Sequence, residues 1–235
     1  MFIDPTYIIF VLPALIFTLW ASAHVKKVYA QHQTQYSQRG LTGAQAAETV
    51  LHRGGVYNVR IEMIGGNLSD HYDPKENVIR LSQEVYSGTS TASIGVAAHE
   101  AGHALQYAGD YLPIRVRAAI IPVTSIGSKL AMPLILIGLL FSAYGQQFGD
   151  IAMLGVMCYG LCTLFQLLTL PVEFNASSRA IEAIEAEGIL TNEETKGAGK
   201  VLRAAALTYV AALAASLAQF LRLFILVSGR TNRRR

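Results

Sequence analysis

The sequence predicts a mainly α-helical integral membrane protein with a small antiparallel β element and a transmembrane helical hairpin. Hydrophobic residues make up 52% of the 235 residues and charged residues only 15%, against about 25% charged in an ordinary soluble domain. The mean hydropathy is +0.35. Residues 7–23 and 151–170 carry no charge at all, and runs of about 20 such residues are long enough to cross a hydrocarbon core about 30 Å thick.

The same composition excludes several other classes of protein. An intrinsically disordered chain could not keep this much apolar surface in water, and a wholly soluble globule would need more charges to cover it. Two cysteines, Cys158 and Cys162, are too few for a disulfide scaffold. The net charge of +3 comes with no basic stripe between aromatic residues, so we expect no nucleic-acid partner.

Residues 1–23 are predicted to form an N-terminal membrane anchor. The residues at 21–23 (Ala-Ser-Ala) resemble a signal-peptidase site. However, Asp4 and no basic residue precede the apolar run, and the run is longer than the usual core of a signal peptide. We therefore expect a retained anchor rather than a cleaved signal.

Residues 118–170 are predicted to form the transmembrane hairpin, with a short loop at 145–150. Basic residues precede this hairpin and follow it, but none lies in the loop. The positive-inside rule therefore places the membrane-proximal domain, residues 24–117, and the segment 171–203 at the cytoplasmic face of the membrane.

The C-terminal segment, residues 204–235, combines an apolar stretch with a basic tail. Gln219 and Arg222 interrupt the apolar stretch at 204–228. A full crossing would also place the tail on the outer side of the membrane, whereas its arginines suit the lipid surface of the cytoplasmic side. The sequence therefore predicts three spans and leaves the fourth open. The tail arginines are Arg230, Arg233, Arg234 and Arg235.

The membrane-proximal domain is predicted to consist of a helix, two strands and a second helix. Thr42 is a good N-cap for a helix that ends at Gly54. Residues 56–64 and 77–82 alternate apolar and polar side chains around a turn signal at 65–67, which predicts the antiparallel β element. A helix over 91–108, capped by the polar residues before it, is apolar nearly all round and should be buried.

This last helix contains the sequence His99-Glu100-Ala101-Gly102-His103, an H-E-x-x-H motif. Histidines at i and i+4 share one face of a helix and can bind one metal ion, most suitably zinc. Glu100 would then lie beside a zinc-bound water and act as general base in peptide hydrolysis. The alternative is a pair of core histidines with a glutamate bonded to the backbone, but burying these groups without a partner is costly.

A catalytic zinc site needs a third protein ligand, for which Glu173 is the predicted residue. It follows a predicted span among apolar and small residues, whereas five later glutamates lie on segments that are predicted to form solvated amphipathic helices. Two crossings separate it from His103, so both fall on one side of the membrane. The alternative is an interfacial acid paired with Arg179. The five other acids are Glu182, Glu185, Glu187, Glu193 and Glu194.

Three separated motifs resemble those of the YugP-type neutral zinc metallopeptidases of bacterial membranes. They are SDHYDPKENVIRLS, SIGVAAHEAGHALQ and PVEFNASSRA, and the similarity extends over most of the chain. The resemblance implies a zincin-like, membrane-embedded peptidase with one Zn²⁺ per chain, bound by His99, His103 and Glu173, with Glu100 as general base. Its partners would be a peptide or membrane-protein substrate and the lipid bilayer.

The chain also resembles, more distantly, the HtpX-type membrane proteases, whose third-ligand motif is E-x-x-A-D. Ser177 stands here in place of that aspartate, which in the second shell would orient a histidine. Ser177 or Arg179 is predicted to serve instead, with Asn175 and Ser178 as alternatives.

His71 and Tyr72 belong to a polar cluster on the β element. Either could stabilise the oxyanion or contact the substrate backbone, and the alternative is a loop held by Asx-type turns before Pro74. If the strand at 77–82 has a free edge, an extended peptide could add to it as a further strand.

Two other functions remain open at the level of sequence. A non-catalytic, zinc-stabilised membrane scaffold or chaperone-like protein would bind zinc without cleaving peptides, but it would not need Glu100. An intramembrane-cleaving protease would usually carry the zinc motif within a spanning segment. The strands just before the motif favour a membrane-proximal site.

Overall fold

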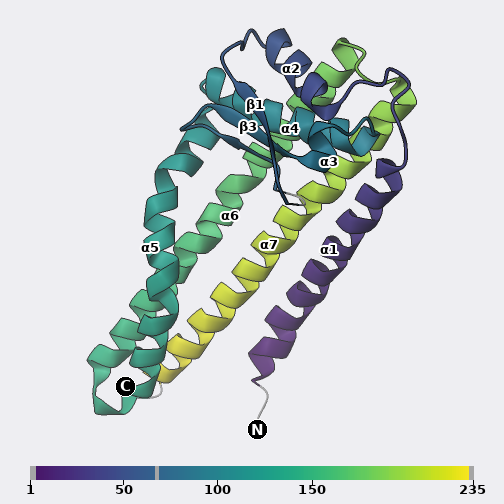
Figure 1. Cartoon of the computed structure of the whole chain (residues 1–235). Helices are drawn as coiled ribbons and strands as arrows, with labels where there is room; N and C mark the ends of the chain where they lie inside the picture. The colour runs from purple at the N-terminus through teal and green to yellow at the C-terminus, as the bar shows by residue number, and fades with distance from the viewer. Residues whose placement is uncertain (1–3, 67–68, 233–235) are drawn as a thin grey trace. The chain divides into compact units, whose positions relative to one another are not determined.

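The computed structural model of the chain describes residues 4–66 and 69–232 (Figure 1). The chain divides into two compact units, each built from segments that are distant in sequence. The helical unit comprises Met1–Ala21, Val116–Leu170 and Thr208–Arg235, and the α/β unit comprises Ser22–Arg115 and Pro171–Leu207. The predicted fold class is confirmed, because the chain is mainly helical with a small sheet and long apolar helices.

Four helices are long and apolar enough to cross a membrane among the residues that the structure describes. The first runs through η1 (Tyr7–Val11) and α1 (Leu12–Gln33), and the others are α5 (Leu112–Leu140), α6 (Gln146–Ala186) and α7 (Asn192–Asn232). The turn between α5 and α6 contains η2 (Ser142–Tyr144), so these two helices form the predicted hairpin.

The hairpin helices approach each other closely because small residues face one another. A Cβ built on Gly155 would lie 2.8 Å from the backbone oxygen of Ala131, and one on Gly138 would lie 2.5 Å from the backbone oxygen of Phe148. Small residues allow this kind of backbone contact between helices in a membrane.

The C-terminal part of α7, which the sequence left open, packs along the hairpin within the helical unit. Leu223 and Val227 share one apolar cluster with Ile135 of α5 and with two residues of α6. The Arg222 side chain donates to the Asp4 carboxylate at 3.1 Å. The structure thus provides a fourth candidate span. Arg233, Arg234 and Arg235 of the expected basic tail and Asn67 of the expected turn lie outside the described residues.

The α/β unit begins with α2 (Gly43–Arg53), whose start was predicted correctly. The Thr42 side chain accepts from the Gln45 amide and the Gln45 side chain accepts from the Thr42 amide, which makes a capping box. The motif helix α4 (Thr91–Ala108) is capped by Ser90. It is buried in a core with α2, strand residues, and the segments of α6 and α7 that belong to this unit.

The sheet is mixed rather than purely antiparallel, which corrects the expected pairing. Its order is β1 (Arg60–Ile64), β3 (Val78–Ser82) and β2 (His71–Asp73), with α3 (Gln83–Tyr86) following β3. Strand β3 runs antiparallel to β2 and parallel to β1. The short strand β2 was not predicted, and it separates β1 from β3 along the chain. A strand that returns beside β1 after this extra reversal must run parallel to it.

The turn between β2 and β3 is closed by polar groups. Asp73 accepts from the backbone amide of Lys75, and Asn77 adopts a left-handed conformation with φ of 53°. Asparagine is one of the few residues that tolerate this conformation. Because β3 has neighbours on both sides, it has no free edge, and the expected addition of a peptide at residues 77–82 is wrong. In this described sheet the edges belong to β1 and β2.

Gly102 sets the approach of α4 to α6 inside the α/β unit. A Cβ at this position would lie 2.5 Å from the backbone oxygen of Ala176 and 3.3 Å from its Cα. Both atoms belong to the backbone, so neither can rotate away. The glycine in the middle of α4 therefore lets the two helices pack backbone to backbone.

We expect Gly102→Ala to destabilise the protein by about 1–3 kcal/mol, because the extra methyl group forces the two helices apart. Chemical denaturation of the detergent-solubilised protein measures this effect. Gly65→Ala is the control, because a Cβ there meets no atom within 4 Å. Equal stability of the two variants would show that the close approach is not required.

Candidate metal centre

Two imidazoles and one carboxylate converge where α4 meets α6. His99 and His103 lie one turn apart on α4, with ring centroids 4.7 Å apart and side chains 14% and 12% exposed. Glu173 on α6 is buried, and its Oε2 lies 3.3 Å from His99 Nε2 and 3.5 Å from His103 Nε2. The structure therefore brings together the three residues that were predicted as metal ligands.

This cluster fits a zinc ion. Each of the three residues offers one ligand atom, and these atoms lie within 4.8 Å of one another. Two imidazole nitrogens and one carboxylate oxygen form a donor set that occurs in catalytic zinc sites, where water or substrate takes the fourth position. A carboxylate that is almost completely removed from water also needs a positive partner, which a metal ion provides.

The electrostatics of the site favour a cation. Burial lowers the pKa of His103, but the hydrogen bond to Glu173 and the negative charges of Glu100 and Glu173 outweigh this effect and raise the pKa above its ordinary value. Two carboxylates therefore create a negative potential around the imidazoles, and the same potential attracts a metal ion.

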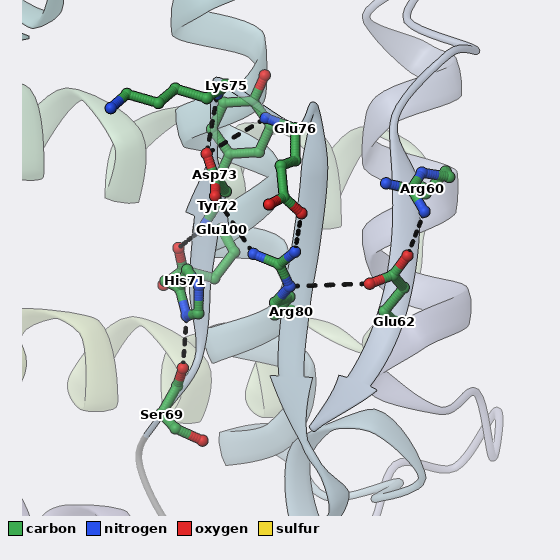
Figure 2. A network of polar contacts seen from close by, with 10 residues as sticks. All are labelled: Arg60, Glu62, Ser69, His71, Tyr72, Asp73, Lys75, Glu76, Arg80 and Glu100. Carbon is green, nitrogen blue, oxygen red and sulfur yellow. Dashed lines mark hydrogen bonds and ion pairs between the residues drawn. The ribbon is translucent and has the colours of Figure 1, made fainter. Parts of the chain in front are cut away.

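Glu100, the predicted general base, is held by the sheet. The residue is 9% exposed, and its Oε2 accepts from the backbone N–H of Tyr72 at 3.1 Å (Figure 2). Tyr72 lies in β2, the edge strand next to α4. The carboxylate therefore has a fixed partner on the side of the sheet, supplied by backbone rather than by a side chain.

The side chain of Gln106 fixes the orientation of His103. Its Nε2 donates to the backbone oxygen of Val172 at 2.7 Å and to Asn175 Oδ1 at 3.0 Å. Because a carbonyl can only accept, the amide oxygen of Gln106 must face His103 Nδ1, which lies 3.0 Å away. Nδ1 then carries the proton, and the Nε2 lone pair is left for a metal.

Gln106 was not predicted as a site residue. It lies three positions after His103, on the same face of α4, and is completely buried. A fully buried glutamine on a helix that carries metal ligands was the available signal, because such a polar side chain must have partners inside the protein.

Ser177 lies next to His99. Its Oγ lies 3.1 Å from His99 Nδ1, so the neutral hydroxyl can take the position of an orienting carboxylate. Arg179 acts at a greater distance. It donates to Asn175 at 2.8 Å and stacks over the ring of Tyr111 at 5.8 Å, so it reaches His103 only through Asn175 and Gln106.

In the described part of the chain, the His71 and Tyr72 side chains contact residues outside the His99, His103 and Glu173 cluster. The exposed His71 ring contacts the backbone oxygen of Ser69 at 2.7 Å, and the Tyr72 hydroxyl donates to Asn77 at 2.8 Å (Figure 2). Burial, followed by Tyr107 and Asp73, raises the pKa of Tyr72. Their predicted role at the oxyanion gains no support from these contacts, and the alternative of a loop held by Asx-type turns fits better.

A charged network fixes the outer face of the same strands. Arg80 of β3 pairs with Asp73, with Glu76 and with Glu62 of β1, so one guanidinium ties together the three strands and the turn (Figure 2). The hydrogen bond from the Lys75 amide, followed by those from Glu76 and Arg80, lowers the pKa of Asp73 despite some desolvation. The network supports β2, from which the Tyr72 amide reaches Glu100.

Comparison with known proteins identifies relatives that are described as zinc peptidases or membrane proteases. The family model described as "Putative neutral zinc metallopeptidase" matches residues 7–228. The chain is 42% identical over 227 residues to the "Putative membrane protease YugP" of Bacillus subtilis (strain 168), an alignment that covers 95% of this chain and 98% of that protein. No solved structure matches.

We expect Gln106→Leu to lower the metal affinity about 10–100-fold, because His103 loses the partner that fixes its ring and tautomer. Competition titration with a chromogenic zinc chelator measures the affinity. Gln83→Leu, on the exposed surface of α3, is the matched control and should bind zinc as the wild type does. Unchanged affinity in Gln106→Leu would contradict the proposed orientation of His103.

Proposed function

Because the chain belongs to the family of neutral zinc metallopeptidases, we propose that it is a membrane-bound zinc peptidase whose catalytic centre is the cluster on α4 and α6. The observation that supports this proposal most directly is the meeting of Glu173 Oε2 with both imidazole Nε2 atoms. One such cluster implies one zinc ion per chain. The ligands would be His99, His103 and Glu173.

A zinc ion bound there would act as a Lewis acid on the peptide carbonyl and lower the pKa of a water molecule. Glu100 provides the proton transfers. Its carboxylate takes a proton from the water as the oxygen attacks the carbonyl carbon, and then gives that proton to the amine nitrogen as the C–N bond breaks. The Tyr72 amide positions the carboxylate for both transfers.

The support groups hold the ligands before substrate arrives. Gln106 and Ser177 occupy the Nδ1 atoms of the two histidines, which leaves both Nε2 atoms directed at Glu173. Metal sites depend on such outer contacts for ligand orientation. The chain thus supplies a preorganised site, and this favours a catalytic over a purely structural role, for which Glu100 would have no use.

We place the catalytic centre at the cytoplasmic face of a bacterial plasma membrane. The basic residues before the hairpin and after the first span support this orientation. Helix α4 is not among the four candidate spans of the described residues, which supports a membrane-proximal site over an intramembrane one. Peptides, or segments of membrane proteins near the bilayer, are the substrates within reach.

We expect Glu100→Gln to retain zinc and to lower kcat about 10²–10⁴-fold, because the amide cannot accept the proton. Glu173→Gln should instead lose zinc, since a neutral amide is a poor ligand for the ion. Metal content and hydrolysis of an unstructured protein such as casein measure the two effects. Glu182→Gln, at an exposed position on α6, is the control. Full activity of Glu100→Gln would refute its role as base.

Removal of zinc by 1,10-phenanthroline should abolish hydrolysis, and added Zn²⁺ should restore it, because the three ligand residues remain in place. The helical content, measured by circular dichroism, should change little. A wild-type protein that binds zinc but cleaves no substrate would instead support the non-catalytic scaffold.

A further inference from the structure

A pocket lies in the α/β unit, between the last turns of α1 and the first half of α7. Its volume is about 240 Å³. Drug-sized ligands need about 300–1,000 Å³, so this pocket suits a small polar group rather than a whole lipid or a peptide. The lining residues are His24, Val28, Gln31 and His32 from α1 and Lys200, Arg203, Ala204 and Leu207 from α7.

The lining of this pocket is basic and contains no acidic residue. Lys200 and Arg203 lie three positions apart on α7, so their side chains share one face of the helix. Both are exposed. The neighbouring acid Glu193 pairs with Lys196 at 2.7 Å. The two cations are therefore available for an external anion, with two imidazoles opposite them on α1.

His32 adds a buried polar atom at the wall of the pocket. The residue is 6% exposed, and its Nδ1 lies 2.8 Å from Gln35 Oε1. Within the described residues its Nε2 is buried without a hydrogen-bond partner. Such atoms are rare in folded proteins and are usually satisfied by water or a ligand. The backbone oxygen of His32 also accepts from Thr91, the first residue of α4.

Two of the lining residues lie next to the ends of apolar segments, where a chain meets the surface of a membrane. His24 follows the uncharged run at residues 7–23 directly, and Leu207 directly precedes the part of α7 that belongs to the helical unit. Residues at the ends of apolar spans lie at the level of lipid headgroups, where basic pockets between helices bind phosphate groups.

From these observations we propose that the pocket between α1 and α7 binds a single anionic phosphate group, carried by an anionic lipid headgroup or free in solution. Lys200 and Arg203 supply the charge, and Arg203 can form two parallel hydrogen bonds to phosphate oxygens. His24, Gln31 and His32 supply polar contacts from α1. A phosphate bound there would join α1 to α7, and through His32 and Thr91 it would also support the start of α4.

The test uses the purified full chain in two settings. The first is nanodiscs of phosphatidylcholine with and without phosphatidylglycerol, and the second is neutral detergent with and without inorganic phosphate. The readout is the thermal unfolding midpoint as a function of anion content. The variant Lys200→Gln/Arg203→Gln removes both cations. The matched control is Lys26→Gln/Lys27→Gln, which removes two exposed charges of α1 outside the pocket lining.

We expect an anion to raise the midpoint of the wild type and of the control, and the half-saturating anion content to rise about tenfold in the pocket variant. A response to phosphatidylglycerol alone identifies the lipid headgroup as the source, and a response to inorganic phosphate identifies free phosphate. The proposal is overturned if no anion raises the unfolding midpoint of the wild type, or if the pocket variant responds as the wild type does. It is also overturned if the half-saturating anion content rises as much in the control as in the pocket variant.

Discussion

The structure of the candidate site depends on one contact between two helices, the approach of Glu173 Oε2 to the Nε2 atoms of His99 and His103. A buried carboxylate between two imidazoles is stable only if a positive charge compensates it. Gly102 makes the approach possible, because no larger residue fits against the backbone of Ala176. One glycine in the motif thus allows the packing of the two helices, and the two histidines of the motif are placed where they could hold a metal ion.

Around this contact the chain builds a set of neutral supports. Ser177 and Gln106 contact the outer nitrogens of the two histidines, and the Tyr72 amide contacts Glu100. A neutral hydroxyl or amide can orient an imidazole without adding negative charge, whereas a carboxylate in the same position would add one. The negative charge therefore stays concentrated on Glu100 and Glu173, next to the position where a cation would bind.

Continuous helices join the candidate ligands to the candidate spans. Helix α6 is the second helix of the hairpin and continues past Pro171 to Glu173 and Ser177 without a break. Helix α7 likewise contains four of the eight residues that line the pocket between α1 and α7, and it continues as the fourth candidate span. Each unit is therefore built from the ends of the same helices.

Sequence alone determined the features that rest on local patterns. The capping box at Thr42, the start of α4 at Ser90, the H-E-x-x-H motif and the hairpin all follow from short-range spacing and composition. Glu173 could also be selected, because it follows a predicted span among apolar and small residues, whereas the five later glutamates lie on amphipathic segments. The tertiary structure decided the rest. The parallel pairing of β1 with β3, the role of Gln106 and the packing of the last part of α7 all depend on partners that are distant in sequence. Such contacts leave no periodic signal in the chain, since they are fixed only when the helices and strands pack together.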